Sequence, residues 1–425
     1  MNIFDQLLAD NQIPKFVRVR HGMDHSHIDD IEGAVAQAMR REGTLDRIKP
    51  GDSVCITAGS RDVANIARII RAICDQVKSV GAHPFIIPAM GSHAGAKAEG
   101  QRGIIEGYGV TEEAMGAPIR ASMDTEVIAH SRSGLEIHLD KFANAADFLI
   151  PVGRIKAHTD FRGEVESGIC KMLVIGMGKQ HGAYQCHKLG FKSMAANVKE
   201  FAGAIIEKKP NMFAIGLIEN AYHQTCRIEA IPAGRILEEE PPLLEYAKSR
   251  MAKVPFDQAD ILFVDETGKD ISGAGMDPNV TGRSPVLGIS RPFFQRIAVF
   301  DLTDKSHGNF GGLGSADVTT QRLYRKIDFE QTYPNGITAA EPLAVRLPAV
   351  MPSDRTAMQF ALRTATDCDW EKGPRIVWLK NTLSLSEFYI SEALIPDAEA
   401  LDNVTIVSEP MEVIFDEEGN VKELR

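Results

Sequence analysis

The sequence has no excess of positive charge and no long apolar run. Its 47 Lys and Arg residues are outnumbered by 58 Asp and Glu residues, so the formal net charge is −11. A nucleic acid or an anionic membrane would call for a basic face, and neither is expected as a partner. No stretch approaches the ~18 consecutive apolar residues of a membrane span. Residues 1–12 lack the basic and apolar regions of a signal peptide.

Cysteine is scarce: the 425 residues include six, scattered along the chain without a C-x-x-C pair. In a chain of this length the pattern favours reduced thiols, and we expect a cytoplasmic protein. The signatures G-x-S-x-G and H-E-x-x-H are absent, and GMGKQ (176–180) does not fit a P-loop. No single motif therefore defines the chemistry.

The pattern of apolar residues predicts an α/β fold. A strand over 53–58, an amphipathic helix over 62–80 and a strand over 84–89 form a βαβ unit, which is typical of a parallel sheet. We also expect strands over 125–130, 135–140, 147–155, 212–220, 260–266, 296–302 and 375–380, and helices over 98–107, 194–209 and 353–365. The length suggests two domains, since typical domains have roughly 100–200 residues.

A domain boundary is predicted near 250–258, after the acidic LEEEPP stretch. We expect a Rossmann-like N-terminal domain over 1–257 that carries the site, and a Rossmann-like C-terminal domain over 258–395. The active site would occupy the cleft between them, and closure of the second domain over the substrate would exclude water. Residues 396–425 are predicted to form a hairpin around 418–420 and to pack back onto the N-terminal domain.

Two histidines lie where predicted strands end: His93 follows the strand 84–89, and His158 follows the strand 147–155. Ligands of open α/β sheets bind at the carboxyl ends of strands, so these histidines could face one crevice. The alternative for each one alone is a loop imidazole bonded to the backbone. The set His21, His25 and His27 has ligand-like spacing, but its polar surroundings favour a solvated loop.

The segment 156–190 is the richest in titratable residues. Lys171 stands in the otherwise apolar run ICKMLVIGM. A buried ammonium needs a charged partner, and buried lysines are readily tuned for covalent chemistry; a packed, snorkelling side chain is the alternative. Arg61 stands at the start of the helix 62–80, where a carboxylate or phosphate could bind. An ion pair with Asp62 is the alternative for Arg61.

The order of four residues resembles the nickel-dependent lactate racemase family, of which the chain would be a divergent member. Gly91-Ser92-His93 matches the family's G-[ST]-H motif after an early strand. His158 matches its second histidine, and Lys171 matches its lysine in a glycine-rich stretch. His187 lies sixteen residues beyond Lys171, which is the family's spacing for the nickel ligand.

The resemblance implies a 2-hydroxyacid racemase or epimerase, which is an isomerase, with a nickel-pincer nucleotide as cofactor. Lys171 would hold the cofactor covalently and His187 would ligate nickel. His93 and His158 would be the two acid–base catalysts, while the cofactor takes hydride from C2 and returns it on the other face. Arg61 would contact cofactor and substrate.

The sequence also departs from the family. Lys171 lies thirteen positions after His158, further than in the family, and Ala58 replaces an acidic residue. The longer stretch brings several charged residues near the site: Asp160, Arg162, Glu164 and Glu166.

In the second domain, Gly268-Lys269-Asp270 matches a family segment, but the following residues 271–283 differ. We expect Lys269, Asn279 and Arg283 to bind the substrate. Because of these differences, a sugar acid or a dicarboxylate is at least as well supported as lactate.

Two other functions stay open. The histidines could bind a plain divalent metal in a hydrolase or lyase, or the chain could bind a small acid or nucleotide without catalysis. The expected partner is a small-molecule 2-hydroxy acid, and a homo-oligomer is compatible with the sequence.

Overall fold

The computed structural model describes residues 3–60, 62–284, 291–339 and 341–425. The chain divides into two compact units. The continuous unit is Asp24–Met251, and the split unit combines Met1–Met23 with Ala252–Arg425. The division at Met251 falls within the predicted boundary region. Residues 1–23 were expected in the N-terminal domain, but they belong to the split unit.

Apart from a hairpin, the strands of the continuous unit form two three-stranded sheets, which an isolated parallel bridge between Leu149 and Met212 connects. β2 (Ser53–Ala58) pairs in parallel with β3 (His83–Pro88) and β6 (Phe148–Ile150). β7 (Val152–Arg154) is parallel to β8 (Phe213–Glu219), which pairs antiparallel with β9 (Thr225–Pro232). β6 and β7 together correspond to the predicted strand 147–155, which is interrupted at Pro151. Proline lacks an N–H for the ladder.

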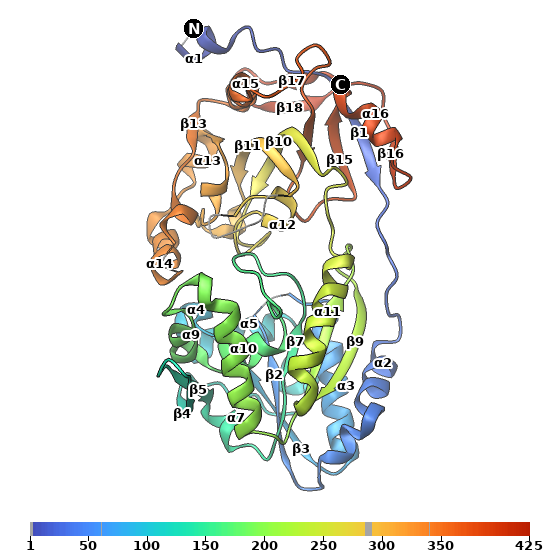
Figure 1. Cartoon of the computed structure of the whole chain (residues 1–425), viewed down its shortest axis with the longest axis vertical. Coiled ribbons are helices and arrows are strands. Elements are labelled where there is room, and N and C mark those ends of the chain that lie inside the picture. Colours follow the sequence, from blue (N-terminus) through green and yellow to red (C-terminus); the bar gives the residue numbers. More distant parts are fainter. Residues whose placement is uncertain (1–2, 61, 285–290, 340) are drawn as a thin grey trace. The chain divides into compact units, whose positions relative to one another are not determined.

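Helices cover both faces of these two sheets (Figure 1). Successive β2 residues point to opposite sides, so Ile56 joins a core with α2 and α3, while Cys55 joins a core with α8, α10 and α11. The helices are α2 (Ile31–Arg40), α3 (Ile66–Ser79), α4 (His93–Ala96), α5 (Ala98–Gly107), α6 (Glu112–Met115), α7 (Lys141–Ala145), α8 (Ile169–Lys171), α9 (Lys179–His187), α10 (Phe191–Lys208) and α11 (Ile236–Arg250). β4 (Thr125–His130) and β5 (Glu136–Asp140) form the predicted hairpin.

The split unit is built on an eight-stranded sheet. Its parallel part, in spatial order, is β13 (Ala349–Met351), β12 (Val318–Thr320), β11 (Phe293–Leu302), β10 (Gln258–Thr267) and β14 (Ile376–Leu379). Its antiparallel part is β15 (Glu387–Ser391), β1 (Phe16–His21) and β16 (Val404–Ile406). The helices are α1 (Ile3–Leu8), α12 (Pro278–Thr281), α13 (Gln321–Arg325), α14 (Phe329–Ala339), α15 (Asp354–Thr364) and α16 (Ile395–Glu399).

The prediction that residues 396–425 pack onto the N-terminal domain is wrong. β16 pairs with β1 within the sheet of the split unit. The predicted hairpin is present as β17 (Val413–Phe415) and β18 (Val421–Leu424), and it packs near α15. The Val421 N–H donates to Asp354 Oδ2 over 2.9 Å, and the Arg355 guanidinium lies 4.5 Å from the Phe415 ring centroid. Both ends of the chain therefore belong to one unit.

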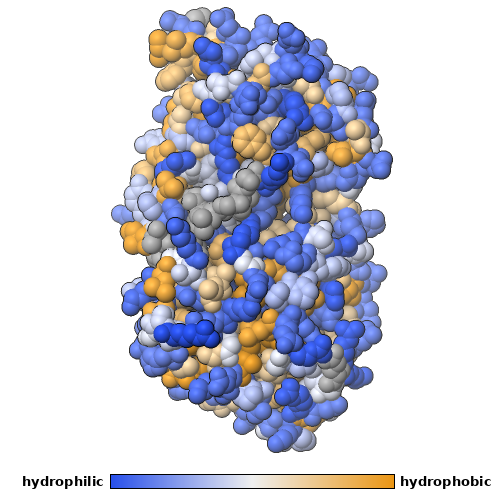
Figure 2. Space-filling view, in the orientation of Figure 1, coloured by the Kyte–Doolittle hydropathy of each residue, from blue (hydrophilic) through white to orange (hydrophobic). Residues whose placement is uncertain are grey.

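The visible surface is mostly hydrophilic, with apolar side chains in small scattered groups (Figure 2). Across the ranges that the structure describes, no helix combines the length and apolar character needed to cross a bilayer.

Candidate functional site

His158 and Lys171 meet in the continuous unit. His158 lies in the loop that follows β7, and Lys171 is the last residue of α8. The loop is closed by backbone hydrogen bonds in both directions between Lys156 and Ser167. As a result His158 Nε2 lies 2.5 Å from Lys171 Nζ. Two residues that the sequence singled out separately are thus in direct contact.

The His158 ring is held on its other sides. The N–H of Asp160 donates to His158 Nδ1 over 3.0 Å, and the Phe161 ring stacks on the imidazole with centroids 4.2 Å apart. A backbone amide can only donate, so Nδ1 accepts and carries no proton in the neutral ring. In the contact with Lys171, Nε2 then carries the hydrogen and Nζ is the acceptor. The Nε2 edge is also the edge that faces Lys171.

Burial is the main cause that lowers the pKa of His158 well below its ordinary value. Burial likewise lowers the pKa of His187, and the hydrogen bond to the Ala183 carbonyl opposes this in part. Both rings are therefore neutral at physiological pH.

His187 is the last residue of α9 and has the geometry of a potential metal ligand. Its Nδ1 lies 2.6 Å from the carbonyl oxygen of Ala183, one turn earlier in the helix. A carbonyl can only accept, so Nδ1 is protonated and Nε2 keeps its lone pair. Metal-bound histidines commonly donate their second N–H in this way.

His93 begins α4 after β3, as the strand-end argument predicted. Its Nδ1 is hydrogen-bonded to the hydroxyl of Ser60, which follows β2. The Gly91 N–H donates to the Gly176 carbonyl, 3.4 Å away. The His93 loop thus packs against the π-helical turn Met172–Gly176 that continues from Lys171.

Two buried carboxylates hold the segment between His158 and Lys171. Glu166 has no exposed side-chain area, and its Oε2 accepts the N–H of His158 over 2.7 Å. Glu240 of α11 caps the start of α8, where its Oε2 accepts the N–H of Cys170 over 2.8 Å. Burial raises the pKa of Glu240. The role of Glu240 was not visible in the sequence, because its partner Cys170 is 70 residues away. Glu166 was expected near the site, but its contact with the His158 backbone was not predicted.

The role of one fully buried lysine was also missed. Lys179 has no exposed side-chain area, and its Nζ lies 3.2 Å from Asp140 Oδ2. Burial lowers the pKa of Lys179 and raises that of Asp140. The Lys179 ammonium also donates to the Pro88 carbonyl at the end of β3. This pair joins three elements of the core beneath the site.

The predicted substrate residues Lys269, Asn279 and Arg283 lie in the split unit. Lys269 Nζ donates to the Gly273 carbonyl over 2.6 Å, and Asn279 Nδ2 donates to Asp277 Oδ1 over 2.7 Å. Their contact with a substrate stays a prediction.

The guanidinium of Arg283 is engaged within the split unit. It pairs with Asp317 Oδ2 at 2.5 Å and donates to the carbonyls of Phe294 and Gln295. These contacts favour a structural role over the predicted role in substrate binding. The remaining predicted residue, Arg61, lies outside the described residues.

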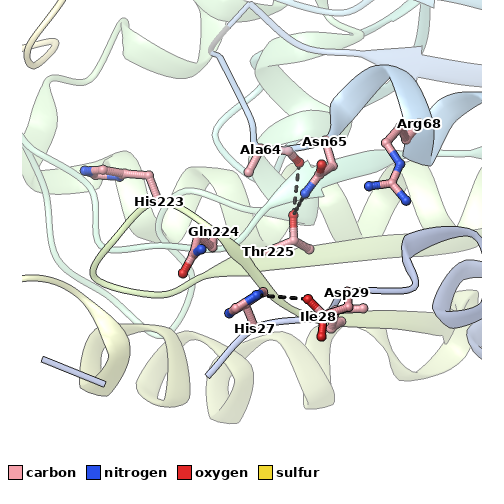
Figure 3. A pocket seen from close by; sticks show the side chains of 9 residues that line it. All are labelled: His27, Ile28, Asp29, Ala64, Asn65, Arg68, His223, Gln224 and Thr225. Carbon is pink, nitrogen blue, oxygen red and sulfur yellow. Dashed lines mark hydrogen bonds and ion pairs between the residues drawn. The ribbon is translucent and has the colours of Figure 1, made fainter. Parts of the chain in front are cut away.

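A pocket of about 400 Å³ lies elsewhere in the continuous unit (Figure 3). It is lined by His27, Ile28, Asp29, Ala64, Asn65, Arg68, His223, Gln224 and Thr225. Arg68 already forms two hydrogen bonds with Glu32, and His27 Nε2 lies 3.1 Å from Asp29. None of the four family-like residues lines it.

In the described part of the chain, no three or more His, Cys, Asp or Glu side chains are arranged to hold a metal ion.

The fold and these residues define an α/β protein with histidine and lysine side chains after the strands of a doubly wound sheet. Neither a protein-family model nor a curated protein sequence matches the chain. Among solved structures it is similar to the lactate racemase apoprotein from Thermoanaerobacterium thermosaccharolyticum. The identity is 14%, the TM-score is 0.52, and the match covers 87% of this chain and 99% of that one.

A structure of a Thermotoga maritima protein also matches, with 11% identity, a TM-score of 0.44, and coverage of 83% of this chain and 87% of that one. The first likeness shows that the chain has the α/β fold of the lactate racemase apoprotein.

Proposed function

We propose that this protein is a racemase or epimerase that inverts C2 of a 2-hydroxy acid with a nickel-pincer nucleotide. The observation that carries the proposal is the contact of His158 with Lys171, at 2.5 Å between their nitrogens. The contact lies in a fold like that of the lactate racemase apoprotein, and it joins residues in the order that the family resemblance requires.

The residues present fit the cofactor. Lys171 would carry it through Nζ. His187 would present the Nε2 lone pair to nickel, since its Nδ1 donates to the Ala183 carbonyl and burial keeps the ring neutral. When bound, the group would supply a hydride acceptor and donor for C2.

The chain itself would orient the substrate and move its hydroxyl proton. The His158 ring is clamped by Phe161 and the Asp160 N–H, so that its Nε2 edge faces the Lys171 side. His93, held by Ser60, would act as the second acid–base group. Two such groups suit a reaction that runs in both directions on two enantiomers.

An inversion assay tests the proposal. The chain is co-expressed with cofactor-making enzymes, then incubated in D2O with single enantiomers of lactate, malate and a sugar acid, and the products are separated by chiral chromatography. We expect one of these acids to be inverted with its C2 hydrogen retained, because hydride that passes through a bound group does not exchange with solvent. Inversion with deuterium at C2 would instead indicate proton abstraction and would overturn the mechanism.

The matched control is a pair of lysine variants. Lys171→Ala is expected to abolish inversion, whereas Lys192→Ala, which changes an exposed lysine of α10, is expected to leave it unchanged. Undiminished inversion by Lys171→Ala would contradict the proposed role of Lys171.

A further inference from the structure

Glu166 contacts the backbone of a proposed catalytic residue rather than any reacting group. It lies in the stretch between His158 and Lys171. Its side chain has no exposed area, and Oε2 accepts the N–H of His158 over 2.7 Å. Burying a carboxylate is costly unless it is paired and hydrogen-bonded, so its partners define its role.

The other carboxylate oxygen is anchored on a different element. Glu166 Oε1 lies 3.0 Å from Nζ of Lys248, which belongs to α11. α11 packs against α8 and β8, so this ammonium is fixed to the framework of the unit rather than to the loop. Glu166 therefore joins the His158 loop to a rigid helix.

Arg162 completes the arrangement. Its Nη1 donates to the carbonyl of His158 and lies 3.5 Å from Glu166 Oε2. The N–H and the C=O of His158 are thus both bound by charged side chains, which form stronger hydrogen bonds than neutral groups do. Because the backbone of His158 is fixed on both sides, Nδ1 of its ring can accept the N–H of Asp160 while Nε2 faces Lys171.

We propose that Glu166, anchored by Lys248, is a positioning residue that fixes the orientation and the tautomer of His158. The inference rests on the proposed function in giving His158 a catalytic role. It adds the prediction that Glu166 acts through His158, without touching substrate or cofactor.

Nitrogen-15 NMR of the full-length chain without cofactor tests this. Two-bond 1H–15N spectra show which ring nitrogen of each histidine carries the proton. The His158 signals are assigned by their loss in His158→Gln. In the wild-type chain we expect one tautomer for His158, with the proton on Nε2.

Three variants are compared with the wild type. Glu166→Gln removes the charge, and Lys248→Met removes the anchor at a partly exposed position. Glu245→Gln is the matched control, since Glu245 also binds Lys248 Nζ, at 2.8 Å, but is 73% exposed. We expect a mixture of tautomers at His158 in the first two variants and a single tautomer in the control.

His138 serves as an internal reference, because its ring is held in the same unit by Thr125 and Glu136. A single tautomer of His158 in either folded variant would overturn the inference. So would a joint change at His158 and His138, since that would indicate general loosening of the unit. The spectra need no cofactor or substrate, so a failed inversion assay beside the expected spectra would reject the proposed function alone.

Discussion

At the scale of single residues, the neutral state of His158 has a consequence for activity. Its ring is buried and its pKa is lowered, so it can exchange a proton near neutral pH without first losing a charge. We expect His158→Gln to lower kcat for both enantiomers by roughly 10²–10⁴-fold, the usual contribution of general acid–base catalysis. The measurement is the inversion rate of the cofactor-loaded protein.

The control for this variant is His25→Gln, which changes an exposed histidine of the same unit. It should invert the substrate at the wild-type rate. A His158→Gln protein that carries the cofactor and keeps more than half of the wild-type kcat would contradict the assignment of His158.

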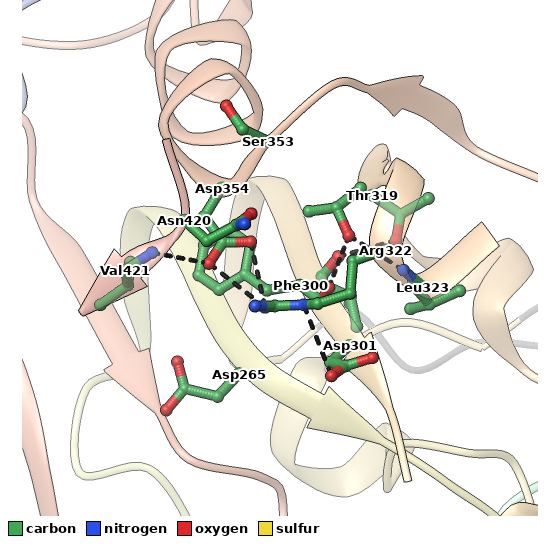
Figure 4. Close-up of polar contacts among 12 residues, drawn as sticks. Asp265, Phe300, Asp301, Thr319, Arg322, Leu323, Ser353, Asp354, Asn420 and Val421 are labelled. Atoms are coloured by element: carbon green, nitrogen blue, oxygen red, sulfur yellow. Dashed lines mark hydrogen bonds and ion pairs between the residues drawn. The ribbon is translucent and has the colours of Figure 1, made fainter. Parts of the chain in front are cut away.

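Asp265 of β10 is a second titratable residue with an unusual environment. Burial raises its pKa from 3.8 to about 7, and the Trp378 indole N–H donates to it over 2.6 Å. Arg322 does not neutralise it, because that guanidinium is bound by Asp354 and Asp301 (Figure 4). Asp265 is therefore protonated in the native state at a pH where the unfolded chain has lost the proton.

The sign of the pH effect follows from this raised pKa. Between about pH 4 and pH 7 the native state binds a proton that the unfolded state does not, so the free energy of unfolding falls as pH rises. Asp265→Asn removes this loss and keeps an acceptor for Trp378. Relative to the wild type, we expect the free energy of unfolding of the variant to rise by roughly 2–4 kcal/mol between about pH 4 and pH 8.

Urea denaturation followed by tryptophan fluorescence measures this gain, because both tryptophans, Trp370 and Trp378, lie in the split unit. Asp304→Asn, at a side chain 92% exposed, is the control and should show no such pH dependence. If the free energies of unfolding of the variant and the wild type differed by the same amount at about pH 4 and at about pH 8, Asp265 would be ionised in the folded protein.

At the scale of elements, the junction between the π-helical turn and α9 leaves no room for a side chain at Gly178. A Cβ there would lie 2.1 Å from the Val174 carbonyl oxygen and 3.0 Å from the Cα of Gly182. Both are backbone atoms that cannot turn aside. This junction links the segment of Lys171 to the helix that carries His187.

We expect Gly178→Ala to lower the free energy of unfolding of the continuous unit by roughly 1–3 kcal/mol, as overpacking does. Gly203→Ala is the control, since its Cβ would meet Leu237 Cδ1 at an ordinary 3.5 Å. In the interior of α10 it should stabilise by up to about 1 kcal/mol. Circular dichroism in urea gives both values, and equal stability of the two variants would refute the packing argument.

Most elements of the continuous unit could be predicted from local patterns. The strand 53–58 and the helix 98–107 have the expected bounds, and Ser353 caps α15 in the split unit as predicted. Strand ends also indicated His93 and His158, because the topology of parallel sheets fixes where such residues gather. The role of Glu240 could not be found in this way, since no spacing marks a carboxylate that binds the N–H of Cys170 from 70 residues away. Glu166 was expected near the site, but its hydrogen bond to the backbone of His158 was not predicted.

At the scale of the whole molecule, both chain ends complete one unit. β1 lies between β15 and β16, and its register with β15 joins Phe16 to Ser391. The expected placement of 396–425 failed for this reason. The pairing of strands that lie far apart in sequence depends on complementary surfaces rather than on local periodicity.

This arrangement predicts how the chain responds to truncation. Residues 24–251 form one continuous segment with cores of their own, so we expect them to fold alone with a cooperative thermal transition. Deletion of residues 1–23 removes an inner strand and should expose the split unit to proteolysis. Limited proteolysis with mass spectrometry tests the 24–251 fragment and the deletion variant. A protected 252–425 segment in the deletion variant would contradict the sheet order.

The most direct test of the central claim is intact-protein mass spectrometry with nickel analysis after co-expression with cofactor-making enzymes. The claim is that Lys171 carries a nickel nucleotide beside His158 and His187. It predicts a nucleotide-sized adduct with about one nickel per chain, lost in Lys171→Ala and kept in Lys192→Ala. Wild-type protein from the same cells that is unmodified and free of nickel would contradict it.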